Sequence, residues 1–239
     1  MGKDTLWSGQ WEIEVRIDGG PVRANHAWRE SCWLSDDEVD YLELEMRLAA
    51  GLRVHRHLLW ARKDRLLLLA DAVIGTRPAA LQYRSRLPLC GDIRFRQAGE
   101  TREGLLVGRK RRARVLPLAL PEWQADRRDG ELWQPPNGLE LRQAAEGRCL
   151  LAPLFFDLDR RRMRKKLTWR QLTVAQLGHV QPAQTAVGYR VSVGKRHWLI
   201  YRALSGAANR TLLGHNLSSE FLVARFTRDG EIEPLVEIE

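Results

Sequence analysis

The sequence predicts an all-β protein: a large antiparallel β-sandwich, super-sandwich-like, of a dozen or more short strands with little helix. Apolar and polar residues alternate with a period of two along much of the chain, and turn residues separate the alternating runs. No window of ten or more residues has a convincing 3.6-residue periodicity. Strands that follow one another without helices favour packed antiparallel sheets, with a closed barrel as the alternative.

The first strands have the clearest pattern. Residues 11–17 place tryptophan, isoleucine and valine on one face and charged residues on the other, and they end at a Gly-Gly-Pro turn. Residues 41–48, 52–61 and 66–74 repeat this pattern as an antiparallel meander. The last of these runs is the most apolar, so we expect it to be the most buried.

The later strands follow the same rule. They are expected at residues 81–87, 93–97, 104–107, 112–118, 139–143, 149–156, 187–193, 196–202, 221–227 and 231–237. Gly194-Lys195 suits a type II′ turn, Asp229-Gly230 is the strongest hairpin signal, and Pro234 is expected on an edge strand. Residues 167–177 are the best helical candidate, although their β-branched and aromatic residues also suit a strand.

The length and composition indicate a globular protein. A chain of 239 residues with 44% hydrophobic and 29% charged residues can form one large all-β domain or two small ones. The Pro- and Gly-containing stretches at 117–121 and 134–138 are too short for flexible linkers, so we predict a single sandwich domain over residues 1–239. Nineteen glycines, ten prolines and three cysteines exclude collagen-like and disulfide-framework classes.

The chain is strongly basic and rich in arginine. Its formal net charge is +9, and six of its 39 basic residues are lysine, so the remaining 33 are arginine. The guanidinium fork suits carboxylate, sulfate or phosphate. The same skew is typical of GC-rich genomes, so composition alone does not establish an anionic partner.

Two dense basic runs are the candidate anion-binding residues. They comprise Arg109, Lys110, Arg111, Arg112 and Arg114 in the first run, and Arg160, Arg161, Arg162, Arg164, Lys165 and Lys166 in the second. Such runs bind sulfate- or phosphate-bearing polymers by releasing counterions. The alternative is that they are solvated strand edges that oppose aggregation. Nucleic-acid modules usually add a recognition helix or aromatic platforms, which makes a nucleic acid the less favoured partner.

His55, His57 and Asp71 are weak candidates for catalysis. The two histidines share one face of a strand, and Asp71 lies on the next strand, where an acid–base pair or half a metal site could form. No third ligand is evident, so we predict neither a metal nor a cofactor, and unpaired sheet-face histidines are the common alternative. The motifs of α/β-hydrolases, P-loop and dinucleotide-binding proteins and zinc proteases do not occur.

Nine tryptophans are available to stack on sugar rings. A sheet face that carries both tryptophan and arginine suits an acidic glycan, whereas most tryptophans are expected in the core.

Residues 28–75 carry a recognisable order of strands. In sequence they contain Arg29-Glu30-x-x-Trp33, Asp37-Glu38-x-Asp40-Tyr41-Leu42-Glu43-Leu44, Val54-x-Arg56-His57-Leu58-Leu59, Lys63-Asp64-Arg65-Leu66-Leu67 and Asp71-Ala72-Val73. This segment, about a fifth of the chain, resembles the C-terminal β-sandwich domain of the heparinase II/III-like polysaccharide lyases. It is also similar to bacterial proteins of unassigned function.

The resemblance implies a carbohydrate-associated sandwich that handles an anionic glycan. In that family a preceding α/α toroidal domain supplies much of the sugar cleft, including a catalytic tyrosine and asparagine. This chain begins almost at once with strands, so we expect no such toroid, and no catalytic residue is transferred.

Three functions follow as hypotheses. The first is a non-catalytic module that binds an anionic polysaccharide or a partner protein. The second is a polysaccharide lyase or other carbohydrate-active enzyme with a histidine-containing cleft, and the third is nucleic-acid binding. Apolar runs too short for a membrane span and an N-terminus without a signal predict a soluble, cytoplasmic protein, or a periplasmic one if the native start is missing.

Overall fold

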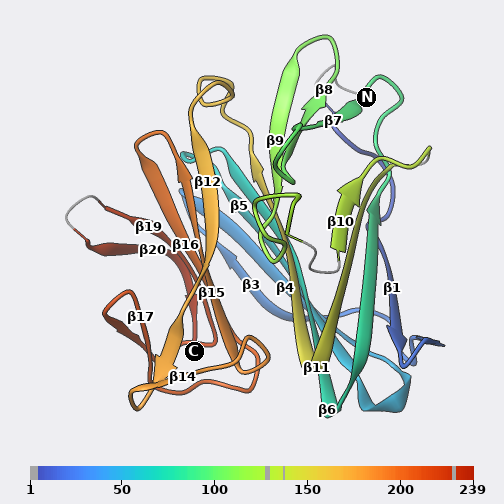
Figure 1. The fold of residues 1–239 in the computed structure, drawn as a ribbon, viewed down its shortest axis with the longest axis vertical. Coiled ribbons are helices and arrows are strands. Elements are labelled where there is room, and N and C mark those ends of the chain that lie inside the picture. The colour runs from blue at the N-terminus through green and yellow to red at the C-terminus, as the bar shows by residue number, and fades with distance from the viewer. Residues whose placement is uncertain (1–4, 127–129, 137, 228–229) are drawn as a thin grey trace.

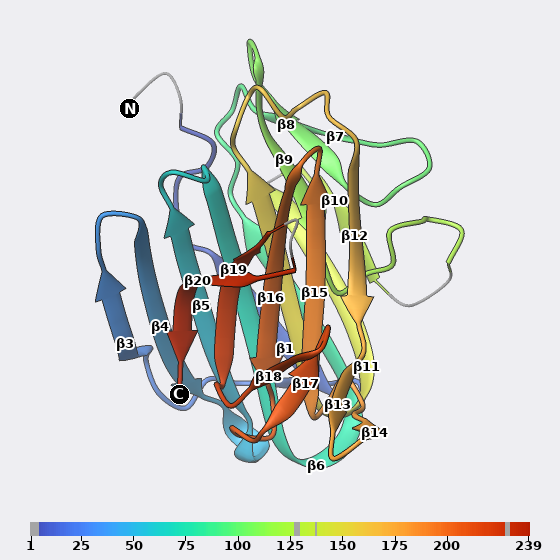
Figure 2. The same cartoon turned by 90° about the vertical axis from the view of Figure 1, so that its left-hand side faces the viewer.

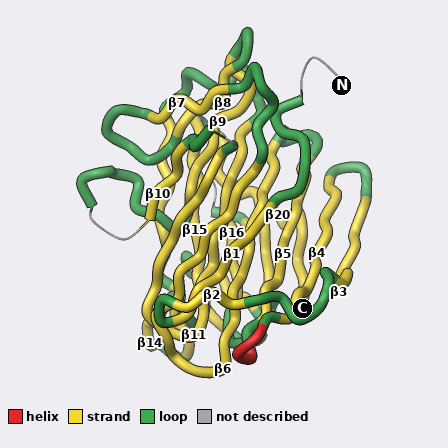
Figure 3. Tube along the Cα trace, turned by 90° about the vertical axis from the view of Figure 1, so that its right-hand side faces the viewer, coloured by secondary structure: helices red, strands yellow, loops and turns green. Residues whose placement is uncertain are grey.

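The computed structural model describes residues 5–126, 130–136, 138–227 and 230–239, and strands make up most of them (Figure 1). Figure 3 shows the one helical segment of the described chain, the short 3-10 turn Ala49–Gly51. The all-β sandwich prediction is therefore confirmed. The strand orders of all the described sheets are open paths, so the alternative of a closed barrel is not formed in this part of the chain.

Three antiparallel sheets build the described part of the molecule. The largest follows the order β3 (Arg29–Ser35), β4 (Val39–Arg47), β5 (Arg53–Ala61), β6 (Leu66–Leu87), β11 (Leu139–Asp157), β9 (Arg111–Pro117), β8 (Gly104–Val107) and β7 (Arg94–Gln97), with β1 (Glu12–Ile17), β2 (Gly20–Val22) and β10 (Gly130–Trp133) branching from it. The second comprises β12 (Leu167–Leu172), β15 (Ala186–Val193), β16 (Arg196–Ala203), β19 (Phe221–Phe226) and β20 (Ile232–Ile238). The third comprises β14 (His179–Val180), β13 (Val174–Gln176), β17 (Arg210–Leu212) and β18 (His215–Leu217).

The strands β6 and β11 pass from one layer into another. The sequence indicated two short strands in each region, but the structure has one strand of 22 residues and one of 19. Both turn at the lower edge in Figure 1, where the register shifts between Gly147 and Cys149. A side chain at Gly75 would bring its Cβ to 3.0 Å from the carbonyl oxygen of Arg148, so glycine lets the two strands approach closely here without a backbone shift.

Three apolar layers hold the sheets together. Trp169, Val191 and Trp198 of the five-stranded sheet pack on Tyr41 and Leu68 of the large sheet. The folded-over halves of β6 and β11, with β1 and β10, pack on the other side of the large sheet through a second cluster. A third cluster lies between the five- and four-stranded sheets. The predicted sandwich is thus extended by further layers, because strands such as β16 bury consecutive residues and so are covered on both faces.

The local predictions have mixed outcomes. Gly194 has φ of 60° between β15 and β16, as a type II′ turn requires, and Pro234 lies on the edge strand β20. The strand alternative holds for residues 167–177, which form β12 and β13 rather than a helix, with the Trp169 side chain buried between sheets. Asp229 lies outside the described residues, although β19 and β20 on either side do pair.

Candidate functional site

The two basic runs meet at one end of the sandwich. The first run covers the β8–β9 hairpin, and the second lies between β11 and β12. The buried guanidinium of Arg114 joins them, because it donates hydrogen bonds to the carbonyl oxygens of Met163 and of Lys165, the latter at 3.1 Å. The β15–β16 turn also reaches this place, where the Gly194 N–H donates to the Lys166 carbonyl at 2.9 Å. Figure 2 shows the three connections along the upper edge.

This convergence forms what we call the basic end. Its exposed cationic residues are Arg109, Lys110, Arg111, Arg160, Arg161, Arg164, Lys165, Lys166, Lys195 and Arg196. Arg160 has an interaction partner, and none of the other side chains forms an ion pair with an acidic residue in the described part of the chain. Asp159 lies nearby but pairs with Arg162 at 3.5 Å and with Arg65 at 3.8 Å. The basic end therefore carries a positive charge that the neighbouring acids do not balance.

Three of the predicted anion-binding residues are partly or wholly withdrawn from solvent. Arg114 is buried and holds the second run through its hydrogen bonds to that run's carbonyl oxygens. Burial lowers the pKa of its guanidinium group. Arg162 forms a close ion pair with Asp157 and lies over the ring of Trp198. Arg112 is half-buried. Conversely, sequence reasoning missed Lys195 and Arg196, because the predicted turn is brought beside Lys166 by the pairing of β12 with β15, in which Leu167 lies opposite Val193.

His55 and His57 belong to a buried polar cluster between the two larger sheets. Glu43 on β4 accepts hydrogen bonds from the His55 Nδ1 at 2.8 Å and from the Tyr41 hydroxyl at 2.9 Å. That hydroxyl has a single proton, so the His57 Nδ1, 2.9 Å away, donates to the tyrosine oxygen. The His57 ring stacks on Phe221, with centroids 4.7 Å apart. These contacts fix the orientation of both imidazoles. The His55 ring lies on the solvent side of the cluster, and the His57 ring lies in the core.

The charges of this cluster are set by burial and by Arg202. Burial and the positive charge of Arg202 lower the pKa of His57 well below its usual value, so that this imidazole is neutral. Burial and the Glu43 carboxylate raise the pKa of Tyr41. Burial opposes ionisation of Glu43, but the hydrogen bonds from His55 and Tyr41 and the charge of Arg202 outweigh it and lower its pKa to about 2.

Replacing Glu43 should change how the free energy of unfolding depends on pH under acidic conditions. A carboxylate with a lowered pKa stabilises the fold above its ordinary pKa of 4.5 and loses that contribution as the pH falls toward about 2. The contribution is about 2–3 kcal/mol. We expect the difference in free energy of unfolding between wild type and Glu43→Gln to shrink by that amount from pH 5 to 2, as measured by urea denaturation. Exposed Glu146→Gln is the control, and a difference that stays constant with pH would contradict the assignment.

Asp71 is not brought together with the histidines. Asp71 pairs across the strands with Arg56, so its side chain lies on the opposite face of the sheet from His55 and His57. The Arg56 guanidinium donates to both carboxylate oxygens of Asp71, at 2.8 and 2.9 Å, and the Tyr83 hydroxyl donates to the same carboxylate at 2.6 Å. The predicted acid–base combination with Asp71 is therefore not formed, and Asp71 holds strands together instead.

A pocket of about 450 Å³ opens beside His55, at the end where β6 turns. Its lining includes the histidine His55, the acidic residue Glu220 and the arginines Arg53, Arg148 and Arg202. We call it the Arg–His pocket. It brings one of the two candidate histidines together with titratable and cationic groups, which is the arrangement that the enzyme hypothesis requires.

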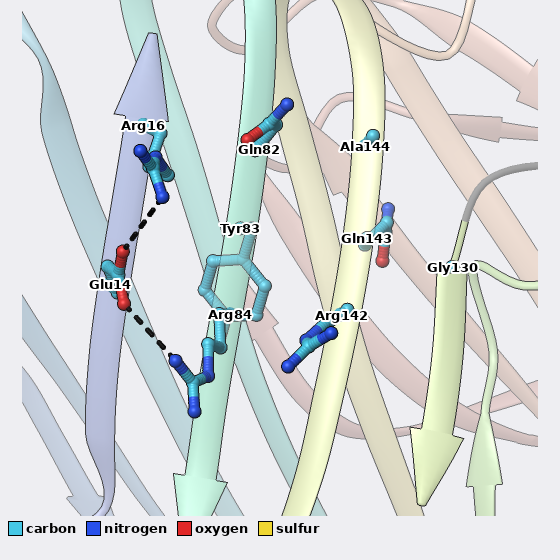
Figure 4. Close-up of a pocket in the computed structure, with 9 residues that line it drawn as sticks. All are labelled: Glu14, Arg16, Gln82, Tyr83, Arg84, Gly130, Arg142, Gln143 and Ala144. Carbon is cyan, nitrogen blue, oxygen red and sulfur yellow. Dashed lines mark ion pairs between the residues drawn. The ribbon is translucent and has the colours of Figure 1, made fainter. Parts of the chain in front are cut away.

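Another pocket, of about 490 Å³, lies on the outer face of β1, β6, β11 and β10 (Figure 4). This face carries both arginine and tryptophan, since the Arg142 guanidinium lies 4.0 Å from the centroid of Trp133. Its arginines are balanced by acids, however: Arg84 contacts Glu140 at 2.7 Å, and Arg142 contacts the same carboxylate at 2.9 Å. The face therefore offers less free positive charge than the basic end.

Comparisons with known proteins extend the fold assignment. No protein-family model and no curated protein matches the chain. Among solved structures, the heparan sulfate lyase HepC from Pedobacter heparinus matches over 80% of this chain and 30% of its own, with 13% sequence identity and a TM-score of 0.51. A mutant of the same lyase gives a TM-score of 0.52. The chain shares its fold with part of HepC.

The resemblance that residues 28–75 indicated to heparinase-type sandwiches is thus confirmed at the level of the fold. A heparinase III structure also matches over 80% of this chain, at 9% identity and a TM-score of 0.43. The chain spans less than a third of the length of HepC or of this heparinase III.

Within the described ranges, no three histidine, cysteine, aspartate or glutamate side chains are grouped as a metal-binding set. The same ranges contain no helix long and apolar enough to cross a lipid bilayer.

Proposed function

We propose that this protein is a non-catalytic, carbohydrate-associated sandwich that binds an acidic polysaccharide through the basic end. The observation that carries the proposal is the meeting of three connections, each with exposed lysines or arginines, at one end of the molecule. A polyanion that lies across them releases counterions from several sulfate or carboxylate groups at once. The fold shared with part of HepC supports a glycan as the polymer.

A nucleic acid fits the basic end less well. Single strands are bound by aromatic side chains on which bases stack, and duplexes are read by a helix or strand in a groove. The large exposed apolar side chains of the described residues are Trp33, Leu34, Trp123, Leu177, Val180 and Leu213. None of them belongs to the three connections of the basic end, so that surface offers charge without stacking platforms.

The proposal is tested with heparin as a sulfated probe, polygalacturonate as a carboxylated probe and dextran as a neutral one. We expect the charged polymers to bind, with a logarithm of the binding constant that falls linearly with the logarithm of the salt concentration, and we expect dextran not to bind. Replacing Lys110, Lys166 and Lys195 with glutamate, one from each connection, should weaken heparin binding at least about tenfold.

A matched variant changes the same charge elsewhere. Arg23, Arg29 and Arg77 are exposed and belong to none of the three connections, so replacing them with glutamate should leave most of the affinity. Equal loss in both variants would overturn the assignment to the basic end. Tighter binding of duplex DNA than of heparin at equal salt would replace the glycan with a nucleic acid. Formation of an unsaturated uronate product that depends on His55 would show a lyase instead of a binding module.

A further inference from the structure

The Arg–His pocket lies at the opposite end of the sandwich from the basic end. β16 begins at Arg196, on the basic end, and approaches the pocket with Arg202 and Ala203. Antiparallel strands of eight residues span roughly 25 Å at about 3.3 Å per residue. A ligand in the pocket therefore occupies a second site, distinct from the polymer-binding surface.

Arg202 is the unusual feature of this pocket. Its side chain is 2% exposed, yet it points between the sheets and lines the pocket. Its Nη1 contacts Glu220 at 3.4 Å, and its Nε has no hydrogen-bond partner within the described chain. A buried guanidinium normally has its donors paired, because an unpaired one loses the hydrogen bonds it made with water. Arg202 is therefore a charged group held inside the protein with part of its binding capacity unused.

Two more arginines reach the same pocket from other strands. Arg53 begins β5 on the face that also carries His55, and Arg148 lies at the register shift of β11, between Gly147 and Cys149. Both are exposed. Three guanidinium groups on three strands can surround one carboxylate, which accepts several charge-assisted hydrogen bonds at once.

His55 and Glu220 supply hydrogen-bonding groups of a different kind. His55 uses Nδ1 as the donor to Glu43, which leaves its Nε2 for a ligand, since the nearest Glu45 oxygen is 3.9 Å away, beyond hydrogen-bond distance. The Glu220 carboxylate is also an acceptor at the pocket lining. Acceptors beside arginines suit a ligand that carries hydroxyl groups as well as a negative charge.

We propose that the Arg–His pocket binds a small hydroxylated carboxylate, about the size of one sugar acid. Its carboxylate lies among Arg53, Arg148 and Arg202, and its hydroxyl groups donate to the His55 Nε2 and to Glu220. The volume of about 450 Å³ lies within the range of small-molecule sites. This site goes beyond the proposed polymer binding and does not depend on it.

The test uses glucuronate as the probe and glucose as its neutral counterpart. Calorimetry should show saturable binding of glucuronate and none of glucose, and NMR should show a shift of the His55 Nε2 resonance on titration. Replacing both Arg53 and Arg148 with alanine should weaken glucuronate binding at least about tenfold. Because both side chains are exposed, this variant is expected to fold. Arg202→Lys, which keeps the buried charge, should also weaken binding, because lysine does not reproduce the guanidinium fork.

The matched control is Arg23 and Arg29 changed to alanine, which should bind glucuronate as wild type does. Absence of saturable glucuronate binding up to its solubility limit, or equal loss in the control, would overturn the pocket assignment. Heparin binding is measured on the same variants. The pocket variant should keep it and the basic-end variant should lose it, so failure of either proposal is recognised separately from failure of the other.

Discussion

Asp71→Ala is expected to lower the free energy of unfolding by about 3–5 kcal/mol, the cost of leaving one partner of a buried ion pair alone. The Asp71 side chain is fully buried and receives both donors of the Arg56 fork. Arg56 also lies over the ring of Trp11, at 3.7 Å, and contacts that of Trp28, at 4.4 Å, and its side chain is only 7% exposed, so water replaces little of what Asp71 supplies. Urea denaturation followed by circular dichroism measures the loss.

The controls for this prediction separate charge from packing. Tyr83→Phe removes one hydrogen bond to Asp71 and keeps the ion pair, so we expect a loss of about 1 kcal/mol. The double change Arg56→Met and Asp71→Leu removes both charges and should recover most of the stability. A loss below about 1 kcal/mol for Asp71→Ala would show that Arg56 finds another partner.

Trp198→Ala is expected to cost about 3–5 kcal/mol, because it leaves a cavity in the core between the two larger sheets. The Trp198 side chain is fully buried, packs against Phe155 with centroids 5.6 Å apart, and donates from Nε1 to Asp64 at 3.1 Å. Loss of that donor also removes one bond from an aspartate that otherwise holds Arg225. Thermal and urea unfolding measure the effect.

Exposed Trp33, on the edge strand β3, is the matched control, and Trp33→Ala should change stability by no more than about 0.5 kcal/mol. Similar losses for Trp33→Ala and Trp198→Ala would contradict the placement of Trp198 in the core. A smaller loss for Trp198→Phe than for Trp198→Ala is expected, because the ring volume is partly kept.

Most individual strands were predictable from sequence, because a strand with one buried face alternates apolar and polar residues. The regions of β6 and β11 were the exception. Each was predicted as two short strands, since the small and glycine residues near 75 and 147 indicated breaks. In the structure both strands continue through those residues side by side, with a shift in their pairing register between Gly147 and Cys149. Local pattern does not distinguish a bend from a loop when both need small side chains.

The candidate sites were predictable only as groups of residues. The two basic runs were evident from their density of lysine and arginine. Within the run at 109–114, however, Arg114 is buried and binds the second run, whereas its neighbours Arg109, Lys110 and Arg111 are exposed. Which side chains are buried depends on what packs against each of them. His55 and His57 were correctly placed on one face, whereas Arg202 gave no signal because it lies more than 140 residues away in an apolar strand.

The sequence by itself determined the all-β class, the strand pattern and the excess of arginine, because these follow from side-chain alternation and composition. Only the tertiary structure decided that three connections share one basic end and that Arg202, His55 and Arg148 line one pocket. Those arrangements depend on pairings between strands far apart in the chain. The partner of each strand is set by the packing of whole sheets, and no local segment of the sequence specifies that packing.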